Sequence, residues 1–135
     1  MDNSAFVGAW RLVSETEQGA DGVVHSARGE NPPGLIMYQA DGMISVQLMR
    51  RDRSGDLRDL ATALDQYLGY YGRYTIDADH QTVTHHLEGC SYPGWVGIDL
   101  VRRYQLSANR LTLTAEMLKN GQPITRVLVW EKVDL

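Results

Sequence analysis

The sequence predicts an all-β fold, an antiparallel up-and-down barrel of about eight to nine strands in one domain over residues 1–135. Short apolar runs recur about every 8–12 residues between turn residues, a spacing typical of a barrel or a sandwich. The turns are short, which favours pairing between strands that follow each other in the chain. Three runs mix Arg, His and Tyr with Leu and Ile on one face. Because burial of such groups is costly unless they are paired or line a cavity, a hollow barrel is favoured over a packed sandwich.

The three mixed strands cover residues 70–76, 83–87 and 100–106. Side chains alternate between the two faces of a strand, so every second residue shares a face. The inward residues predicted in this way are Tyr70, Gly72, Tyr74 and Ile76; Val83, His85 and Leu87; and Leu100, Arg102, Tyr104 and Leu106. These residues are expected to line the interior of the barrel.

The first part of the chain predicts strands at residues 8–16, 23–25, 35–39 and 43–49. Pro32 and Pro33 break regular pairing before the third of these strands. The Ala-Asp-Gly sequence at residues 40–42 predicts the tight turn of a hairpin between the third and the fourth.

One helix is predicted over residues 57–68, because apolar residues recur there at helical spacing. Ser54 or Asp56 can cap its start, and Gly69 can end it. The helix leads directly into the strand at residues 70–76, so it is expected to cover one mouth of the barrel. A helix that fills a hydrophobic gap fits the same pattern.

The second part of the chain returns to alternating runs, which predict strands at residues 70–76, 81–88, 98–106, 111–115 and 124–133. A loop with Pro93, Gly94 and Trp95 separates two of them, and Trp95 is expected at the rim of the barrel. The closing strand places Arg126 on the same face as Leu128 and Trp130.

Composition narrows the class of partner. The net charge is -4 and the isoelectric point is near 5.5, which argues against binding to nucleic acid. No apolar run is long enough to span a bilayer or resembles a secretory signal, and the single cysteine, Cys90, excludes an intrachain disulfide. We therefore expect a cytoplasmic protein that does not associate with membranes. The oligomeric state stays open, with a homodimer as one option.

Several motifs together resemble a known family. The opening Gly8-Ala9-Trp10 resembles the Gly-x-Trp start of the calycins, the lipocalins and their relatives. A longer ordered set is similar to the lipocalin-like domain family of bacteria and fungi: residues 71–74 (YGRY), 83–89 (VTHHLEG), 93–97 (PGWVG), 101–106 (VRRYQL) and 128–131 (LVWE). The resemblance covers nearly the whole chain and implies a calycin-like antiparallel barrel with an internal cavity. It also implies a basic residue stacked on Trp10, for which Arg102 and Arg126 are the candidates.

His85 and His86 are adjacent in one predicted strand, so their side chains point to opposite faces and cannot bind one metal ion together. No metal site or cofactor is predicted. His85 shares the inward face, where it is either a general acid or base or a structural histidine bonded to a tyrosine. His86 and Glu88 replace it as candidates if a bulge reverses the facing.

An inward Arg102 needs an aromatic face, a carboxylate or an anionic ligand. The tyrosine rings and the methionine side chains of the predicted strands add apolar surface to the interior. The ligand-binding residues predicted are Tyr38, Met43, Tyr70, Tyr74, His85, Trp95, Arg102 and Tyr104.

The leading functional hypothesis is binding of a small, largely apolar or aromatic molecule in the barrel. The alternative is a cofactor-independent isomerase, cyclase or dehydratase of natural-product biosynthesis, acting on a polyketide-like or terpenoid substrate. In that case His85 is the acid or base, and Arg102 or a tyrosine polarises a carbonyl. A third option is an interaction module whose barrel is filled by its own side chains.

Overall fold

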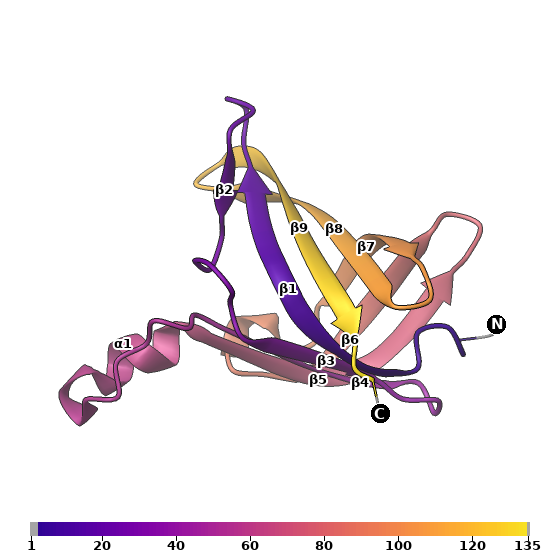
Figure 1. Ribbon diagram of the computed structural model, residues 1–135, viewed down its shortest axis with the longest axis horizontal. Coiled ribbons are helices and arrows are strands. Elements are labelled where there is room, and N and C mark those ends of the chain that lie inside the picture. Colours follow the sequence, from indigo (N-terminus) through magenta and orange to yellow (C-terminus); the bar gives the residue numbers. More distant parts are fainter. Residues whose placement is uncertain (1–2, 135) are drawn as a thin grey trace.

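The computed structural model describes residues 3–134, and most of them lie in one antiparallel sheet that curls into a barrel (Figure 1). The strand order is β2-β1-β3-β4-β5-β6-β7-β8-β9, and β1 also pairs with β9, which closes the barrel. The elements are β1 (Gly8–Gln18), β2 (Val24–Ser26), β3 (Gly34–Tyr38), β4 (Met43–Met49), η1 (Leu57–Asp59), α1 (Leu60–Asp65), β5 (Tyr67–Asp77), β6 (Thr82–Cys90), η2 (Pro93–Trp95), β7 (Asp99–Leu106), β8 (Arg110–Lys119) and β9 (Gln122–Lys132). The predicted up-and-down antiparallel barrel is confirmed.

Strand β1 is shared between three neighbours. Its first half pairs with β3, its second half pairs with β2, and β9 runs along its other edge. The short β2 is therefore an extra strand added to an eight-stranded closed barrel.

A β-bulge in β1 changes which side chains enter the barrel. The register against β9 shifts between Leu12 and Ser14, so Val13 is the extra residue. Alternation from Trp10 predicts Ser14 on the inner face, but after the bulge the buried residue is Glu15. The bulge thus brings a carboxylate into the interior.

The one predicted helix is present but shorter than expected. Tyr67 and Leu68 belong to β5, because they pair with Met49 and Leu48 of β4. The η1–α1 segment projects from the barrel beside its mouth, and Ala63 is its buried residue (Figure 1). It does not lie across the mouth.

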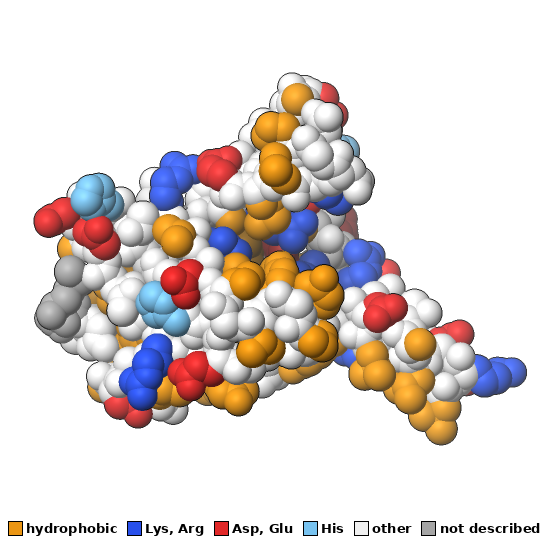
Figure 2. Space-filling view, turned by 180° about the vertical axis from the view of Figure 1, so that it is seen from behind, with side chains coloured by type: hydrophobic (Ala, Val, Ile, Leu, Met, Phe, Trp, Pro, Cys, Tyr) orange, Lys and Arg blue, Asp and Glu red, His pale blue; other side chains and the backbone are white. Residues whose placement is uncertain are grey.

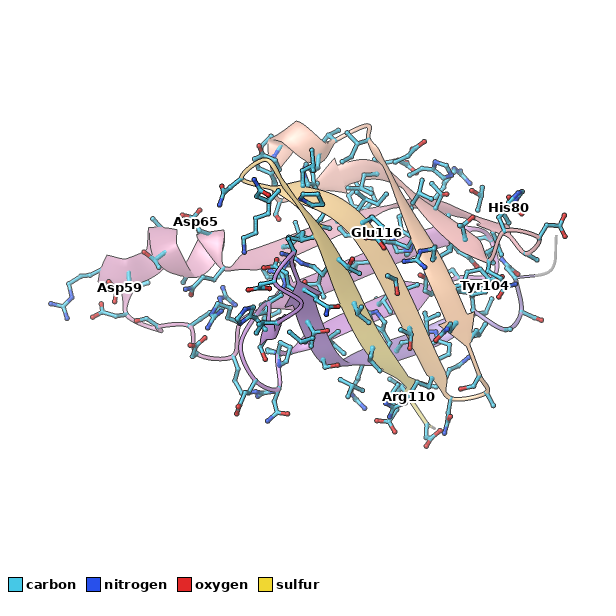
Figure 3. The ribbon with its side chains drawn as sticks, turned by 90° about the horizontal axis from the view of Figure 1, so that it is seen from above. Asp59, Asp65, His80, Tyr104, Arg110 and Glu116 are labelled. Atoms are coloured by element: carbon cyan, nitrogen blue, oxygen red, sulfur yellow. The ribbon has the colours of Figure 1, made fainter. Side chains whose placement is uncertain are left out.

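One end of the barrel is closed by an aromatic plug, formed by Phe6, Tyr38, Tyr74 and Tyr104. Phe6 contacts Tyr38 and Tyr104 edge-on, with ring centroids 5.2 and 4.9 Å apart, and Tyr38 contacts Tyr74 at 4.8 Å. Figure 3 places Tyr104 at the end opposite the helical segment that carries Asp59 and Asp65. For residues 3–134, the interior therefore opens toward the α1 end.

Within residues 3–134, no helix has the length and apolar character needed to cross a membrane.

Candidate functional site

The barrel contains a small cavity with about 50 Å³ of free space, at the end away from the aromatic plug. Much of its wall is apolar, with Ile36, Val46, Leu48, Leu100, Leu113 and Leu128 among the lining side chains. Arg28, Leu68 and Trp95 line both this cavity and a surface depression outside it, so they mark the mouth. Figure 2 shows arginine or lysine side chains beside hydrophobic ones in the hollow between the two projecting parts of the molecule.

His85 is held between two tyrosines in the middle of the barrel. The alternation of β6 turns it inward, opposite Tyr74 of β5, and it is 1% exposed. Its Nε2 lies 2.8 Å from the Tyr38 hydroxyl and its Nδ1 lies 2.7 Å from the Tyr70 hydroxyl. Both ring nitrogens are thus occupied by neutral partners.

Burial sets the charge state of His85 and of its two tyrosine partners. Desolvation lowers the pKa of His85 to about 3, and the charge of Arg102 acts in the same direction. Burial also raises the pKa values of Tyr38 and Tyr70 above the ordinary value. At neutral pH the three groups are therefore an uncharged, hydrogen-bonded set, with Tyr38 in the plug and Tyr70 in the cavity wall.

A charged network lines the opposite wall. Glu15 is buried and accepts a hydrogen bond from Arg28 Nε at 2.6 Å, and Arg126 Nη1 lies 3.6 Å from its other oxygen. Arg126 also donates to Glu17, which accepts a further bond from Lys119 at 2.9 Å. The hydrogen bonds from Arg126 and Lys119 hold the pKa of Glu17 below its ordinary value. Two arginines of the wall are therefore fixed by carboxylates.

Arg102 also lines the cavity, as the alternation of β7 predicts. It does not stack on Trp10, and neither does Arg126. Lys132 takes that position instead, with Nζ 4.7 Å from the Trp10 ring centroid and a hydrogen bond to the Val7 carbonyl oxygen. Lys132 is the cross-strand partner of Trp10 in the β1–β9 pairing, which explains the contact.

The cavity includes four of the eight predicted ligand-binding residues: Tyr70, His85, Trp95 and Arg102. Tyr38, Tyr74 and Tyr104 face inward but belong to the plug, where they pack on Phe6 or on each other. Met43 is on the outer face of β4, because Ile44 and Val46 of that strand are the buried residues. These four residues do not line the cavity.

The reserve candidates lie outside the barrel. His86 Nε2 is 2.9 Å from Thr75 Oγ1, and His86 Nδ1 is 2.8 Å from Asp99 Oδ1. Glu88 is exposed, at 4.0 Å from Arg73. Within residues 3–134, no group of three or more His, Cys, Asp or Glu side chains is arranged to hold a metal ion.

Comparison with known proteins agrees with this geometry. A family model described as a lipocalin-like domain matches residues 7–133. The chain belongs to this family. The resemblance drawn from the sequence motifs is thereby confirmed.

This lipocalin-like domain is 30% identical over 88 residues to the 4'-hydroxy-3'-methoxypropiophenone carrier protein ppsC of Aspergillus oryzae, over 59% of this chain and 79% of that protein. Among solved structures, a complex of bovine odorant binding protein with a selenium-containing odorant matches with a TM-score of 0.52 and 15% identity. That match covers 100% of this chain and 74% of the bovine chain. It supports the fold of the lipocalin-like domain.

Sequence reasoning did not predict several cavity residues of this lipocalin-like domain, among them Glu15, Arg28 and Trp130. The bulge at Val13 hides Glu15, since simple alternation assigns it to the outer face. Arg28 follows β2 in a loop and carries no periodic signal. Trp130 shares the inward face of β9 with Arg126 and Leu128, so the alternation itself contained the evidence for it.

Proposed function

We propose that this lipocalin-like domain binds a small, largely apolar or aromatic molecule inside its barrel. The observation that carries the proposal is a cavity with apolar walls and a small set of polar side chains, open at one end of a barrel plugged at the other. Such a combination is typical of small-molecule sites. The similarity to a carrier protein named for an aryl ketone supports the same class of ligand.

The size of the cavity defines how the ligand must enter. Its free space of about 50 Å³ is enough for a few water molecules. Pockets for drug-sized molecules begin at roughly 300 Å³. Uptake therefore requires lining side chains to change rotamer, and the long side chains of Arg102 and Met117, which no carboxylate of the described residues holds, are the ones with that freedom.

The state of His85 favours binding over acid–base turnover. A general base works best with a pKa near the working pH, whereas burial holds the pKa of His85 near 3. Both of its nitrogens are engaged by Tyr38 and Tyr70. We infer that His85 positions Tyr70 and is not a catalytic residue.

Calorimetric titration with 4'-hydroxy-3'-methoxypropiophenone and with other single-ring aromatic compounds tests the proposal. The cavity-filling variant Ala115→Met places a larger side chain in the wall, and Thr114→Met adds the same side chain on the outer face of β8. We expect Ala115→Met to weaken binding at least tenfold and Thr114→Met to leave it within twofold. An absence of binding by the unmodified protein, or equal binding by both variants, overturns the proposal.

We propose a cytoplasmic location, supported by the single cysteine, Cys90, which leaves the fold without an intrachain disulfide. The homodimer stays a prediction, and light scattering after size-exclusion chromatography tests it.

A further inference from the structure

The positive charges of the cavity outnumber its carboxylates. Arg28, Arg102 and Arg126 line it, and Glu15 is the acidic residue among the lining side chains. Arg28 and Arg126 form ion pairs with Glu15, and Arg126 forms a second one with Glu17. Within residues 3–134, Arg102 has no carboxylate partner, and its side-chain hydrogen bond goes to the neighbouring Val101 carbonyl oxygen at 3.2 Å. Among the described residues, Arg102 is thus the one cation of the cavity that forms no ion pair, and the charge of Glu15 acts on it only from a distance.

That arrangement is unfavourable for the empty barrel. Desolvation lowers the pKa of Arg102 below its ordinary value, and the nearby charge of Arg126 acts in the same direction. A half-buried guanidinium without a counter-ion loses hydration and gains little in return. A negatively charged group beside Arg102 would replace the favourable hydration that the guanidinium loses on burial.

Two further donors in the wall have no partner. The indole Nε1 of Trp130 and the guanidinium Nε of Arg126 are buried and make no hydrogen bond to any described residue. Trp130 is 1% exposed, and both residues line the cavity. Both atoms donate and cannot accept, so the group that satisfies them must be an acceptor.

The hydrogen bonds of His85 leave the Tyr70 hydroxyl as a third free donor. A neutral imidazole has one N–H and one acceptor nitrogen, so His85 donates to one tyrosine and accepts from the other. His85 is the hydrogen-bond partner of the deeply buried Tyr38 hydroxyl, which is satisfied when it donates to Nε2. Nδ1 then donates to Tyr70, and the hydroxyl proton of Tyr70 is free for a molecule in the cavity.

We propose that the ligand carries an anionic oxygen group, a carboxylate or an ionised enol or phenol, and that Arg102 binds this group. The inference rests on the proposed ligand-binding function and narrows it to acids with an apolar or aromatic body. Tyr70, Arg126 and Trp130 supply additional donors to the polar part of the ligand, while Leu113 and Leu128 contact the apolar part.

Matched ligands with and without charge test the proposal. Calorimetric titration compares trans-cinnamate with cinnamamide, which has the same body and a neutral head group. We expect cinnamate to bind at least tenfold more tightly. In Arg102→Met this preference should fall to less than threefold, while cinnamamide binding stays within twofold. Arg103→Met is the matched control, because Arg103 is the next residue of β7 and lies on the outer face, paired with Glu116.

A second pair of measurements assigns the anion. 4-Nitrophenol changes its visible absorbance when it ionises, and a lowered pKa in the presence of the protein identifies an oxygen anion of the enol or phenol type. An unchanged pKa together with tight cinnamate binding assigns a carboxylate. Equal binding of cinnamate and cinnamamide, or an unchanged preference in Arg102→Met, overturns the inference and leaves the proposed function intact. If neither compound nor any other aromatic probe binds, the proposed function fails as well.

Discussion

The buried His85 makes the stability of this domain depend on pH between 7 and 5. In the folded barrel its pKa is about 3, whereas an imidazole of the unfolded chain titrates near 6.5. As the pH falls below the unfolded value, the unfolded chain takes up a proton that the folded barrel does not bind, so the free energy of unfolding falls. We expect a loss of about 2 kcal/mol from pH 7 to pH 5. It continues at ~1.4 kcal/mol per pH unit until the pH approaches the folded pKa.

Urea unfolding followed by tryptophan fluorescence at pH 7 and pH 5 measures this loss. In His85→Gln the amide supplies one donor and one acceptor for Tyr38 and Tyr70, but it does not titrate. His86→Gln is the matched control, because His86 lies on the outer face of the same strand. We expect the unmodified protein and His86→Gln to lose about 2 kcal/mol more than His85→Gln. Equal losses in the unmodified protein and His85→Gln would refute the buried neutral state of this histidine.

Three further substitutions test the packing around the site by urea unfolding at pH 7. Gly72→Ala directs a Cβ into the backbone carbonyl oxygen of His86, and we expect a loss of about 3 kcal/mol. Glu15→Gln removes the buried carboxylate that two arginines share, and because their ends reach solvent we expect about 2 kcal/mol. Lys132→Met removes the cation over the Trp10 ring and one hydrogen bond, for a loss of about 1 kcal/mol. A variant as stable as the unmodified protein contradicts the contact on which its prediction depends.

Local alternation was enough to predict the interior of the three mixed strands. Tyr70, Tyr74, His85 and Leu100 are buried, and Arg102 lines the cavity. The pattern succeeded because no bulge interrupts these strands at those residues. The irregularity between β5 and β6 lies opposite Tyr71 and Gly72, but its extra residue is Glu88 of β6, so the alternation of β5 itself is not interrupted.

Long-range pairing explains what local patterns could not predict. The bulge at Val13 depends on the register of β1 against β9, and it alone turns Glu15 inward. The cation on Trp10 follows from the same register, which sets Lys132 opposite the tryptophan. Tyr67 extends β5 at the expense of the predicted helix because β4 offers it a hydrogen-bonded partner. The prediction for Met43 did not depend on long-range pairing. Simple alternation along β4 already places Ile44 and Val46 inward and Met43 outward.

The position of His85 sets the depth to which a ligand can enter. On the side of the aromatic plug, Tyr38 is fixed edge-on by Phe6 and Tyr74, so the closed end of the barrel has no freedom to widen. On the side of His85 away from Tyr38, Tyr70 lines the cavity wall, and the long side chain of Arg102 can move. We therefore expect the cavity to enlarge toward the mouth when a ligand binds, with the bound molecule in contact with Tyr70. The side chain on which the expected acid sensitivity depends is thus also the one that holds Tyr70 toward the proposed ligand, through its hydrogen bonds to Tyr38 and Tyr70.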